Sequence, residues 1–292
     1  MPSIIVPAYN EAPALRRLLP RLLAGAEPDE FEVVVIANGC TDDSAEAARS
    51  FGPAVRVLET PVANKFRALR LGDEAAGSFP RIYLDSDVEL GCADARALAA
   101  AVQAGPVLAA APEREIPLAG CSWTVRWYYE VWLRLPVVRS GLFGRGVIAV
   151  SAAGYERLAA IPELMGDDLA ASLAFSEQER TVVEQARALI YPPRTLADLV
   201  RRRTRVNTVT AQAGARAELA GAGAEARTSR ADLMALIRSA PVRMTPRVAW
   251  FLYVTVVTRR KSRKAVAAGD FATWLRDESS RESATSTGGT SV

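Results

Sequence analysis

The sequence predicts an α/β protein whose sheet is largely parallel and covered by helices on both faces. Short runs of β-branched and other apolar residues alternate with helical patterns through roughly the first ninety residues. Continuous apolar runs are typical of strands buried on both faces, as in parallel sheets. Polar turn clusters follow several of these runs, where a strand would end. Regular alternation of strand and helix favours a parallel sheet with helices on both sides.

The expected elements of this first part follow one another in that order. Ser3–Glu11 contains a short β-branched strand broken by a proline turn, and leucines at helical spacing follow it between Leu15 and Leu23. The remaining expected elements are a strand at Phe31–Ala37, a helix at Ala45–Ser50, a strand at Val55–Glu59, a helix from Asn64 that stops at Gly72, and a strand at Arg81–Leu84.

Two aspartates, Asp85 and Asp87, directly follow the apolar run Arg81–Leu84 and are the most informative feature of the chain. Ligands of open α/β sheets bind at the carboxyl ends of the strands. Two carboxylates at one such point repel each other unless a cation lies between them, and Mg²⁺ or Mn²⁺ carrying a diphosphate suits this role. The alternative interpretation is an ordinary polar loop after a strand.

The second part of the chain is expected to add two strands, at Val107–Ala111 and Val147–Ser151. Glycines between Gly141 and Gly146 would let the backbone approach a ligand, or would form an ordinary loop. The aromatic stretch between Trp123 and Trp132 has helical spacing and fits either a buried core or a platform for a sugar ring. A helix bearing several arginines is expected at Thr195–Arg205.

The composition excludes several kinds of chemistry. The chain of 292 residues contains no histidine, which removes Ser-His-Asp and Cys-His catalysis and the commonest ligand of transition metals. The three cysteines, Cys40, Cys92 and Cys121, form no Cys-x-x-Cys pair and fit a reduced, cytoplasmic protein. A net charge of +3 and short basic runs do not indicate nucleic-acid binding. A carboxylate base and an oxygen-bound divalent metal remain.

The four strand-end motifs resemble family 2 glycosyltransferases of the GT-A fold, bacterial type. The resemblance is carried by Pro7–Glu11, by Asn38–Asp43, by the helix start at Asn64-Lys65 and by Asp85-Ser86-Asp87. It is specific over about the first ninety residues and looser to about residue 205. It implies a GT-A fold, which is Rossmann-like, with a mostly parallel mixed sheet flanked by helices, here followed by a C-terminal helical extension.

The resemblance also implies roles for residues that bind the donor, a nucleoside diphosphate sugar. Asp42 would contact the base, or alternatively cap a helix, and Lys65 would lie near the diphosphate, or alternatively be a solvated surface lysine. Asp85 and Asp87 would hold Mg²⁺ or Mn²⁺. The residues expected at the donor are Pro7, Ala8, Tyr9, Asn10, Glu11, Asn38, Asp42, Lys65, Asp85, Ser86, Arg202 and Arg205.

Asp167 and Asp168 match the position of the family's Glu-Asp motif, with Asp167 where Glu is usual. By this match Asp168 is the general base and Asp167 supports it or binds the acceptor. The alternative is that both are acids favoured at a helix start. The Gln-x-x-Arg-Trp motif of processive synthases is missing from the arginine-rich helix, which weakens a polymer-synthase interpretation.

The sequence therefore predicts a metal-dependent, inverting transferase that moves a sugar from a nucleoside diphosphate sugar, such as a UDP-sugar, to an acceptor hydroxyl on a lipid, metabolite or glycan. The alternatives are a retaining GT-A glycosyltransferase, a nucleotidyltransferase, and a sugar-nucleotide-binding protein without activity. A nucleotidyltransferase would need a Gly-rich basic loop after the first strand, and Pro7–Glu11 has no glycine.

The expected organisation is a catalytic domain at 1–210, divided into a nucleotide-sugar-binding half at 1–90 and an acceptor half at 91–210. A helical extension at 211–280 and a disordered tail at 281–292 would follow. Within the extension, the apolar segment Val248–Val257 is too short to span a bilayer and is followed by a basic run at Arg259–Lys264. It is expected to pack on the protein or a second subunit, or to touch the inner face of a membrane.

Overall fold

The computed structural model describes residues 1–160, 174–214 and 228–268, and the side chains of residues 209–214 are excluded from the description. The expected disordered tail at 281–292 lies outside these residues, as do Asp167 and Asp168. The described chain divides into two compact units. The first contains residues 1–116, 137–160, 174–190 and 212–214, and the second contains residues 117–136, 191–211 and 228–268.

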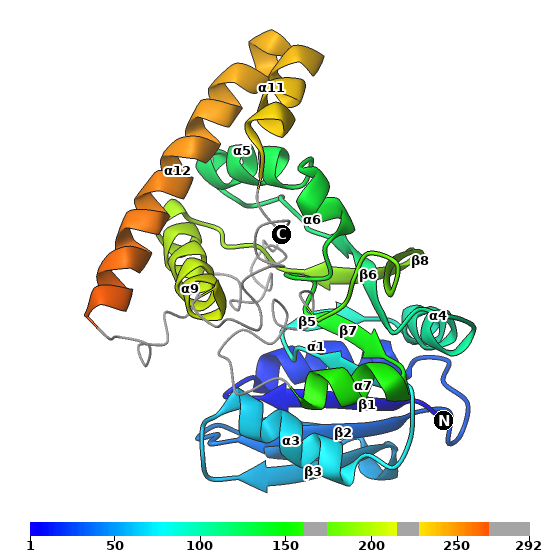
Figure 1. Ribbon diagram of the computed structural model, residues 1–292. Helices are drawn as coiled ribbons and strands as arrows, with labels where there is room; N and C mark the ends of the chain where they lie inside the picture. The colour runs from blue at the N-terminus through cyan, green and yellow to red at the C-terminus, as the bar shows by residue number, and fades with distance from the viewer. Residues whose placement is uncertain (161–173, 215–227, 269–292) are drawn as a thin grey trace, which may run out of the picture. The chain divides into compact units, whose positions relative to one another are not determined.

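The first unit is built on an eight-stranded sheet formed by the described residues (Figure 1), with the strand order β3-β2-β1-β4-β7-β6-β8-β5. Strands β3, β2, β1 and β4 are mutually parallel, β7 runs antiparallel to both of its neighbours, and β8 is parallel to β6. The strands are β1 (Ser3–Ala8), β2 (Glu32–Asn38), β3 (Val55–Thr60), β4 (Arg81–Leu84), β5 (Val88–Leu90), β6 (Ala109–Glu115), β7 (Val147–Val150) and β8 (Arg180–Ile190). The predicted mixed, mostly parallel sheet is confirmed.

Helices follow most of these strands and cover both faces of the sheet. In the first unit they are α1 (Ala12–Leu23), α2 (Ser44–Arg49), the 3₁₀ turn η1 (Gly52–Ala54), α3 (Lys65–Ala75), α4 (Cys92–Gln103) and α7 (Ala152–Ala159); α6 (Pro136–Ser140) begins at the boundary between the units. Alternate residues of a strand face opposite sides of its sheet, so each strand supplies two cores.

The two cores show this alternation directly. Ile4 and Val6 of β1 pack with the leucines of α1 and with α4, whereas Ile5 packs with Val34 and Ile36 of β2 and with Ala68 of α3. All of these side chains are buried. A single-residue slip of β1 would exchange the two cores, so the β-branched run determines the register of the sheet.

Three details of the sequence prediction need correction. The helix predicted to stop at Gly72 continues to Ala75. A Cβ atom at Gly72 would lie 2.4 Å from Ile5 Cγ2, so this glycine permits close helix–sheet packing and does not end the helix. The strand predicted at Val107–Ala111 is Ala109–Glu115, and β5, β8 and α4 were not predicted from the sequence. Strand β8 carries charged residues between its apolar ones and a pairing irregularity with β6, which obscures its period.

The second unit is helical in its described part. It contains α5 (Trp123–Trp132), most of α9 (Leu196–Gly214), α11 (Arg230–Ser239) and α12 (Pro241–Ala267). Tyr128 of α5 stacks on Phe251 of α12 with ring centroids 5.1 Å apart, and Thr208 of α9 donates to Ser262 Oγ at 3.1 Å. The apolar segment therefore packs against its own chain along one face. No described helix is long and apolar enough to cross a membrane.

Arg145 has the largest fully buried side chain of the described residues. Its guanidinium donates to the carbonyls of Gly141, Pro112 and Arg139 at 2.9, 2.5 and 2.6 Å. Burial lowers the pKa of Arg145 to about 10, with Glu113 at 3.7 Å opposing the shift, so the group is still charged at neutral pH. One side chain thus serves carbonyls of β6, of α6 and of the turn that follows α6.

We expect Arg145→Met to lower the free energy of unfolding by about 3–5 kcal/mol, because it leaves buried carbonyls without donors. Urea unfolding followed by circular dichroism measures this loss. Arg139→Met is the matched control, since the Arg139 side chain is exposed and should cost less than about 0.5 kcal/mol. Equal and small losses in the two variants would contradict this role of Arg145.

Candidate active site

The loops after β1 and β2 are joined at the carboxyl ends of these strands. Asn10, with a left-handed φ of 53°, accepts from the Thr41 backbone N–H at 2.7 Å through Oδ1 and donates to Thr41 Oγ1 at 3.2 Å through Nδ2. Asn38 is buried and donates to the Ala8 carbonyl at 2.7 Å. These contacts hold Pro7–Glu11 against the turn after β2.

Asp42 lies in this turn and is exposed, but its two carboxylate oxygens already have partners. Oδ2 accepts from the Ala12 N–H at the start of α1 at 3.2 Å, and Oδ1 accepts from the Ser44 N–H at 3.1 Å and from Ser44 Oγ at 2.5 Å. Asp42 therefore bonds to the first residue of α1 and to the first residue of α2, in line with its alternative interpretation as a residue of a helix start. A carboxylate has about four acceptor sites, so these bonds leave capacity for a base N–H.

Lys65 and Asp85 form an ion pair that links the start of α3 to the end of β4. Lys65 Nζ lies 2.7 Å from Asp85 Oδ1, and each side chain is about one-third exposed, at 31% and 29%. Asn64 caps α3 by accepting from the Arg67 N–H at 3.0 Å, which places Lys65 in the first turn. The lysine predicted at the diphosphate and an aspartate predicted at the metal are thus brought together.

The remaining residues of the Asp-x-Asp turn lie between β4 and β5. Ser86 is buried, whereas Asp87 is partly exposed and makes no ion pair with any described residue. No cluster of three or more Cys, Asp or Glu residues suited to a metal is found in the described ranges. Mg²⁺ and Mn²⁺ commonly use one or two protein carboxylates together with phosphate oxygens and water. The two hard carboxylates therefore fit such an ion when it arrives with a diphosphate.

Gly146 lies directly against this turn. Its carbonyl accepts from the Asp85 N–H at 2.8 Å, and its φ is 65°. A Cβ atom there would lie 2.5 Å from Val88 Cγ2 and 3.3 Å from Asp85 Oδ2. The glycine-bearing turn thus supports Asp85, and Arg145 and Arg114 hold the same loop through its backbone carbonyls.

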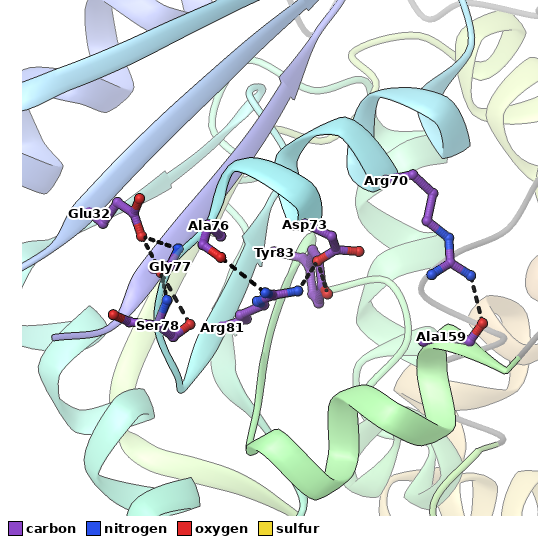
Figure 2. Close-up of polar contacts among 10 residues, drawn as sticks. Glu32, Arg70, Asp73, Ala76, Gly77, Ser78, Arg81, Tyr83 and Ala159 are labelled. Carbon is purple, nitrogen blue, oxygen red and sulfur yellow. Dashed lines mark hydrogen bonds and ion pairs between the residues drawn. The ribbon is translucent and has the colours of Figure 1, made fainter.

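A second polar cluster lies at the opposite end of β4 (Figure 2). Arg81 donates to Asp73 Oδ1 at 2.9 Å and to the Ala76 carbonyl at 3.1 Å, and Tyr83 donates to the same Asp73 oxygen at 2.7 Å. Burial raises the pKa of the Asp73 carboxyl despite these bonds, and it also raises the pKa of Tyr83. Because the cluster begins at the first residue of β4, we interpret it as a structural link between α3 and the sheet.

The other predicted site residues belong to the second unit or lie outside the described residues. Arg202 and Arg205 lie on α9 in the second unit, where Arg202 donates to the Tyr191 carbonyl at 3.1 Å. Asp167 and Asp168 lie outside the described residues. Thr41 and Ser44 were not predicted from the sequence to anchor these loops. Their hydroxyls beside Asp42 and Asp43 were the available signal, because such groups bond to nearby backbone at turns.

Comparison with known protein families assigns the N-terminal part of the chain to a family. Residues 3–136 match the model of "Glycosyl transferase family 2". This segment belongs to that family. It includes the loop after β1, the turn containing Asp42, the Lys65–Asp85 pair and Asp87. The family 2 resemblance of the sequence motifs is confirmed.

Curated relatives match over a short region. The chain is 35% identical over 94 residues to an undecaprenyl-phosphate 4-deoxy-4-formamido-L-arabinose transferase of Pseudomonas savastanoi pv. phaseolicola, covering 30% of this chain and 28% of the relative. It is 31% identical over 90 residues to glycosyltransferase AglE of Haloferax volcanii, covering 29% of this chain and 30% of that relative. The chain thus matches under a third of the length of these relatives.

Solved structures resemble the chain over nearly its whole length. A mannosyltransferase, PcManGT from Pyrobaculum calidifontis, in complex with GDP-Man and Mn²⁺, superposes with a TM-score of 0.62 at 20% identity and covers 90% of this chain and 86% of that chain. S. aureus TarS 1–349 in complex with UDP-GlcNAc gives a TM-score of 0.51 at 15% identity and covers 92% of both chains. These similarities show the fold, and the predicted GT-A fold is confirmed.

Proposed function

We propose that this protein is a glycosyltransferase that moves a sugar from a nucleoside diphosphate sugar, such as a UDP-sugar, to an acceptor hydroxyl with inversion at the anomeric carbon. The observation that carries the proposal is the Lys65–Asp85 pair beside Asp87 at the carboxyl end of β4. Family 2 membership of residues 3–136 supports it, as do the nucleotide sugars in the structures that resemble this fold.

The donor would be bound along the ends of β1, β2 and β4. The loop at Tyr9–Glu11 and Asp42 would surround the nucleoside, and Lys65 would contact the diphosphate as a point charge. Asp85 and Asp87 would hold Mg²⁺ or Mn²⁺, which neutralises negative charge on the diphosphate when bound.

The Lys65–Asp85 pair affects how the metal ion and the diphosphate would bind. Lys65 pairs with Asp85, whereas Asp87 makes no ion pair with any described residue. A diphosphate brings negative charge that attracts Lys65 away from Asp85, and it thereby frees the Asp85 carboxylate. The residues are therefore suited to bind metal and diphosphate together more tightly than either alone.

For the acceptor side, Asp168 would remove the proton of the acceptor hydroxyl while Asp167 orients the acceptor. The names of the curated relatives favour a second candidate, a lipid-linked phosphate acceptor. A phosphate oxygen is already deprotonated near neutral pH and needs no base. The two acceptor classes therefore differ in how strongly they would depend on Asp168.

Three other functions are weaker alternatives. A retaining transferase would share the donor half. A nucleotidyltransferase would require a glycine-rich loop, and there is no glycine between Pro7 and Glu11. A sugar-nucleotide-binding protein without activity would not need Asp87.

The proposal is tested by incubating the full-length protein with a panel of UDP-, GDP- and dTDP-sugars plus Mn²⁺ and measuring release of the nucleoside diphosphate. We expect one donor class to be hydrolysed slowly without acceptor and faster with a suitable acceptor, and NMR of the product to show an inverted anomeric centre. Retention of configuration would remove the inverting mechanism. Absence of release and of binding across the whole panel would contradict a glycosyltransferase.

A further inference from the structure

The second unit exposes a band of aromatic and aliphatic side chains on α5 and α12. Trp123 of α5 is 52% exposed, and Leu252, Tyr253 and Val256 of α12 are 43%, 58% and 46% exposed. The aromatic rings are in contact: Trp123 lies 5.5 Å from Trp250, and Trp250 stacks on Tyr253 at 5.3 Å. These side chains form one continuous apolar feature of the unit.

The same helix continues into a cluster of positive charges. Arg259, Arg260, Lys261, Arg263 and Lys264 are all exposed. None of them forms an ion pair within the described residues, and the 27 residues of α12 include no Asp or Glu. The two earlier arginines of the helix, Arg243 and Arg247, differ because both pair with Glu130 of α5.

The apolar and basic residues share one side of the helix. Residues 252, 256, 260 and 264 are spaced by four, so they follow one another along α12 as Leu, Val, Arg and Lys. The opposite side, with Val248, Phe251, Val254, Thr258 and Ser262, is buried against the rest of the unit, as the course of α12 beside α5 and α9 in Figure 1 illustrates. The exposed side is therefore not the side that stabilises the fold. We call the exposed side of α12, together with Trp123 of α5, the aromatic–basic surface. It consists of Trp123, Trp250, Leu252, Tyr253, Val256, Arg259, Arg260, Lys261, Arg263 and Lys264.

We propose that the aromatic–basic surface binds the headgroup region of an anionic lipid bilayer, with α12 lying in the plane of the membrane. Tryptophan and tyrosine are suited to this region because each ring has an apolar body and a polar edge. Exposed lysines and arginines beside an apolar band are attracted to acidic headgroups. No described helix could span the bilayer, so the contact is peripheral.

A second copy of the chain fits this surface less well than a lipid bilayer. A symmetric dimer contact uses the same patch on both subunits. Two such patches would place the exposed lysines and arginines against a second α12 helix, which has no acidic residue to pair with them. An anionic bilayer supplies the opposite charge along the whole length of the run. This inference does not depend on the sugar-transfer activity.

The test measures binding of the full-length protein to vesicles made of equal amounts of phosphatidylcholine and phosphatidylglycerol, with vesicles of phosphatidylcholine alone as the neutral comparison. We expect binding to the anionic vesicles that weakens as salt is raised. Arg260→Ala combined with Arg263→Ala should weaken it about 30-fold, since each surface charge near anionic lipid contributes about fivefold in affinity.

The matched control removes two arginines from the first unit, Arg49→Ala with Arg56→Ala, and therefore causes the same change in net charge. It should leave vesicle binding within about twofold of wild type, because these residues lie on α2 and β3 and not on the proposed surface. Thermal melting of each variant checks that it is folded. An equal loss in the control would show a general effect of net charge and overturn the assignment to α12.

The apolar half of the surface needs its own measurement. Tyr253→Ser should weaken binding to anionic vesicles while leaving melting unchanged, because Tyr253 is exposed in the protein. Lipids brominated on their acyl chains should quench the tryptophan fluorescence of wild type, and Trp123→Phe should reduce that quenching. Failure to bind anionic vesicles, or a wild-type dimer that Tyr253→Ser dissociates, would overturn the proposal.

Discussion

Asp87→Ala is expected to lower sugar transfer by on the order of 10³-fold, because stabilisation of the leaving diphosphate by a bound divalent ion contributes several kcal/mol. Asp87 is the partly exposed carboxylate of the Asp-x-Asp turn, and Asp85 beside it is already paired with Lys65. Removing Asp87 therefore removes the carboxylate that is available to an incoming ion.

A binding measurement separates this role from a structural one. Calorimetric titration of UDP with Mn²⁺ present should show a large loss of affinity in Asp87→Ala, whereas titration in EDTA should show almost none. Glu74→Ala is the matched control, because it removes an exposed carboxylate near the C-terminal end of α3. Equal losses with Mn²⁺ and with EDTA would mean that Asp87 supports the turn and does not hold a metal.

Asp168→Asn should reduce transfer to a hydroxyl acceptor by roughly 10²–10⁴-fold, which is the usual contribution of a general base. The substitution keeps the size and polarity of the side chain but removes its ability to accept a proton. Donor affinity should change little, since the base acts on the acceptor. Asp167→Asn is the matched comparison and should raise acceptor KM more than it lowers kcat.

The same variant distinguishes the two acceptor classes. With a phosphate acceptor, Asp168→Asn should retain most of its activity, because a phosphate monoester has a second pKa of about 6 and is largely ionised at neutral pH. Comparing the activities of wild type and Asp168→Asn with a hydroxyl acceptor and with a polyprenyl phosphate acceptor distinguishes the two classes. A larger loss of turnover in Asp167→Asn than in Asp168→Asn would assign the base to Asp167.

Much of the first half of the fold follows from local sequence. The strands β1 and β2 are buried on both faces. A strand buried on both faces is a continuous apolar run, as from Ile4 to Val6, and such a run predicts a buried strand directly. The carboxyl ends of parallel strands meet at one edge of a sheet, which is why the sequence alone predicts Asn10, Asp42 and Asp85 at one edge.

The contacts that these side chains make depended on the tertiary structure. The sequence shows that Lys65 and Asp85 are 20 residues apart, but only the packing of α3 against β1 and β2 brings Nζ within 2.7 Å of Oδ1. Asp42 was expected at a base or at a helix cap, and the fold directs its oxygens to Ala12 and Ser44, which belong to two different helices. A side chain that caps a helix far away in the sequence leaves no pattern in the residues around it from which the cap could be predicted.

What the sequence alone determined is the set of short-range features, namely the strands buried on both faces, the turn residues after them and the positions of the carboxylates. The tertiary structure decided which glycine is a packing contact and not a helix stop, as at Gly72, and which side of α12 is covered. The reason is physical: backbone preference and hydrophobic period act over a few residues, whereas close approach, ion pairing and burial depend on segments that only folding brings together.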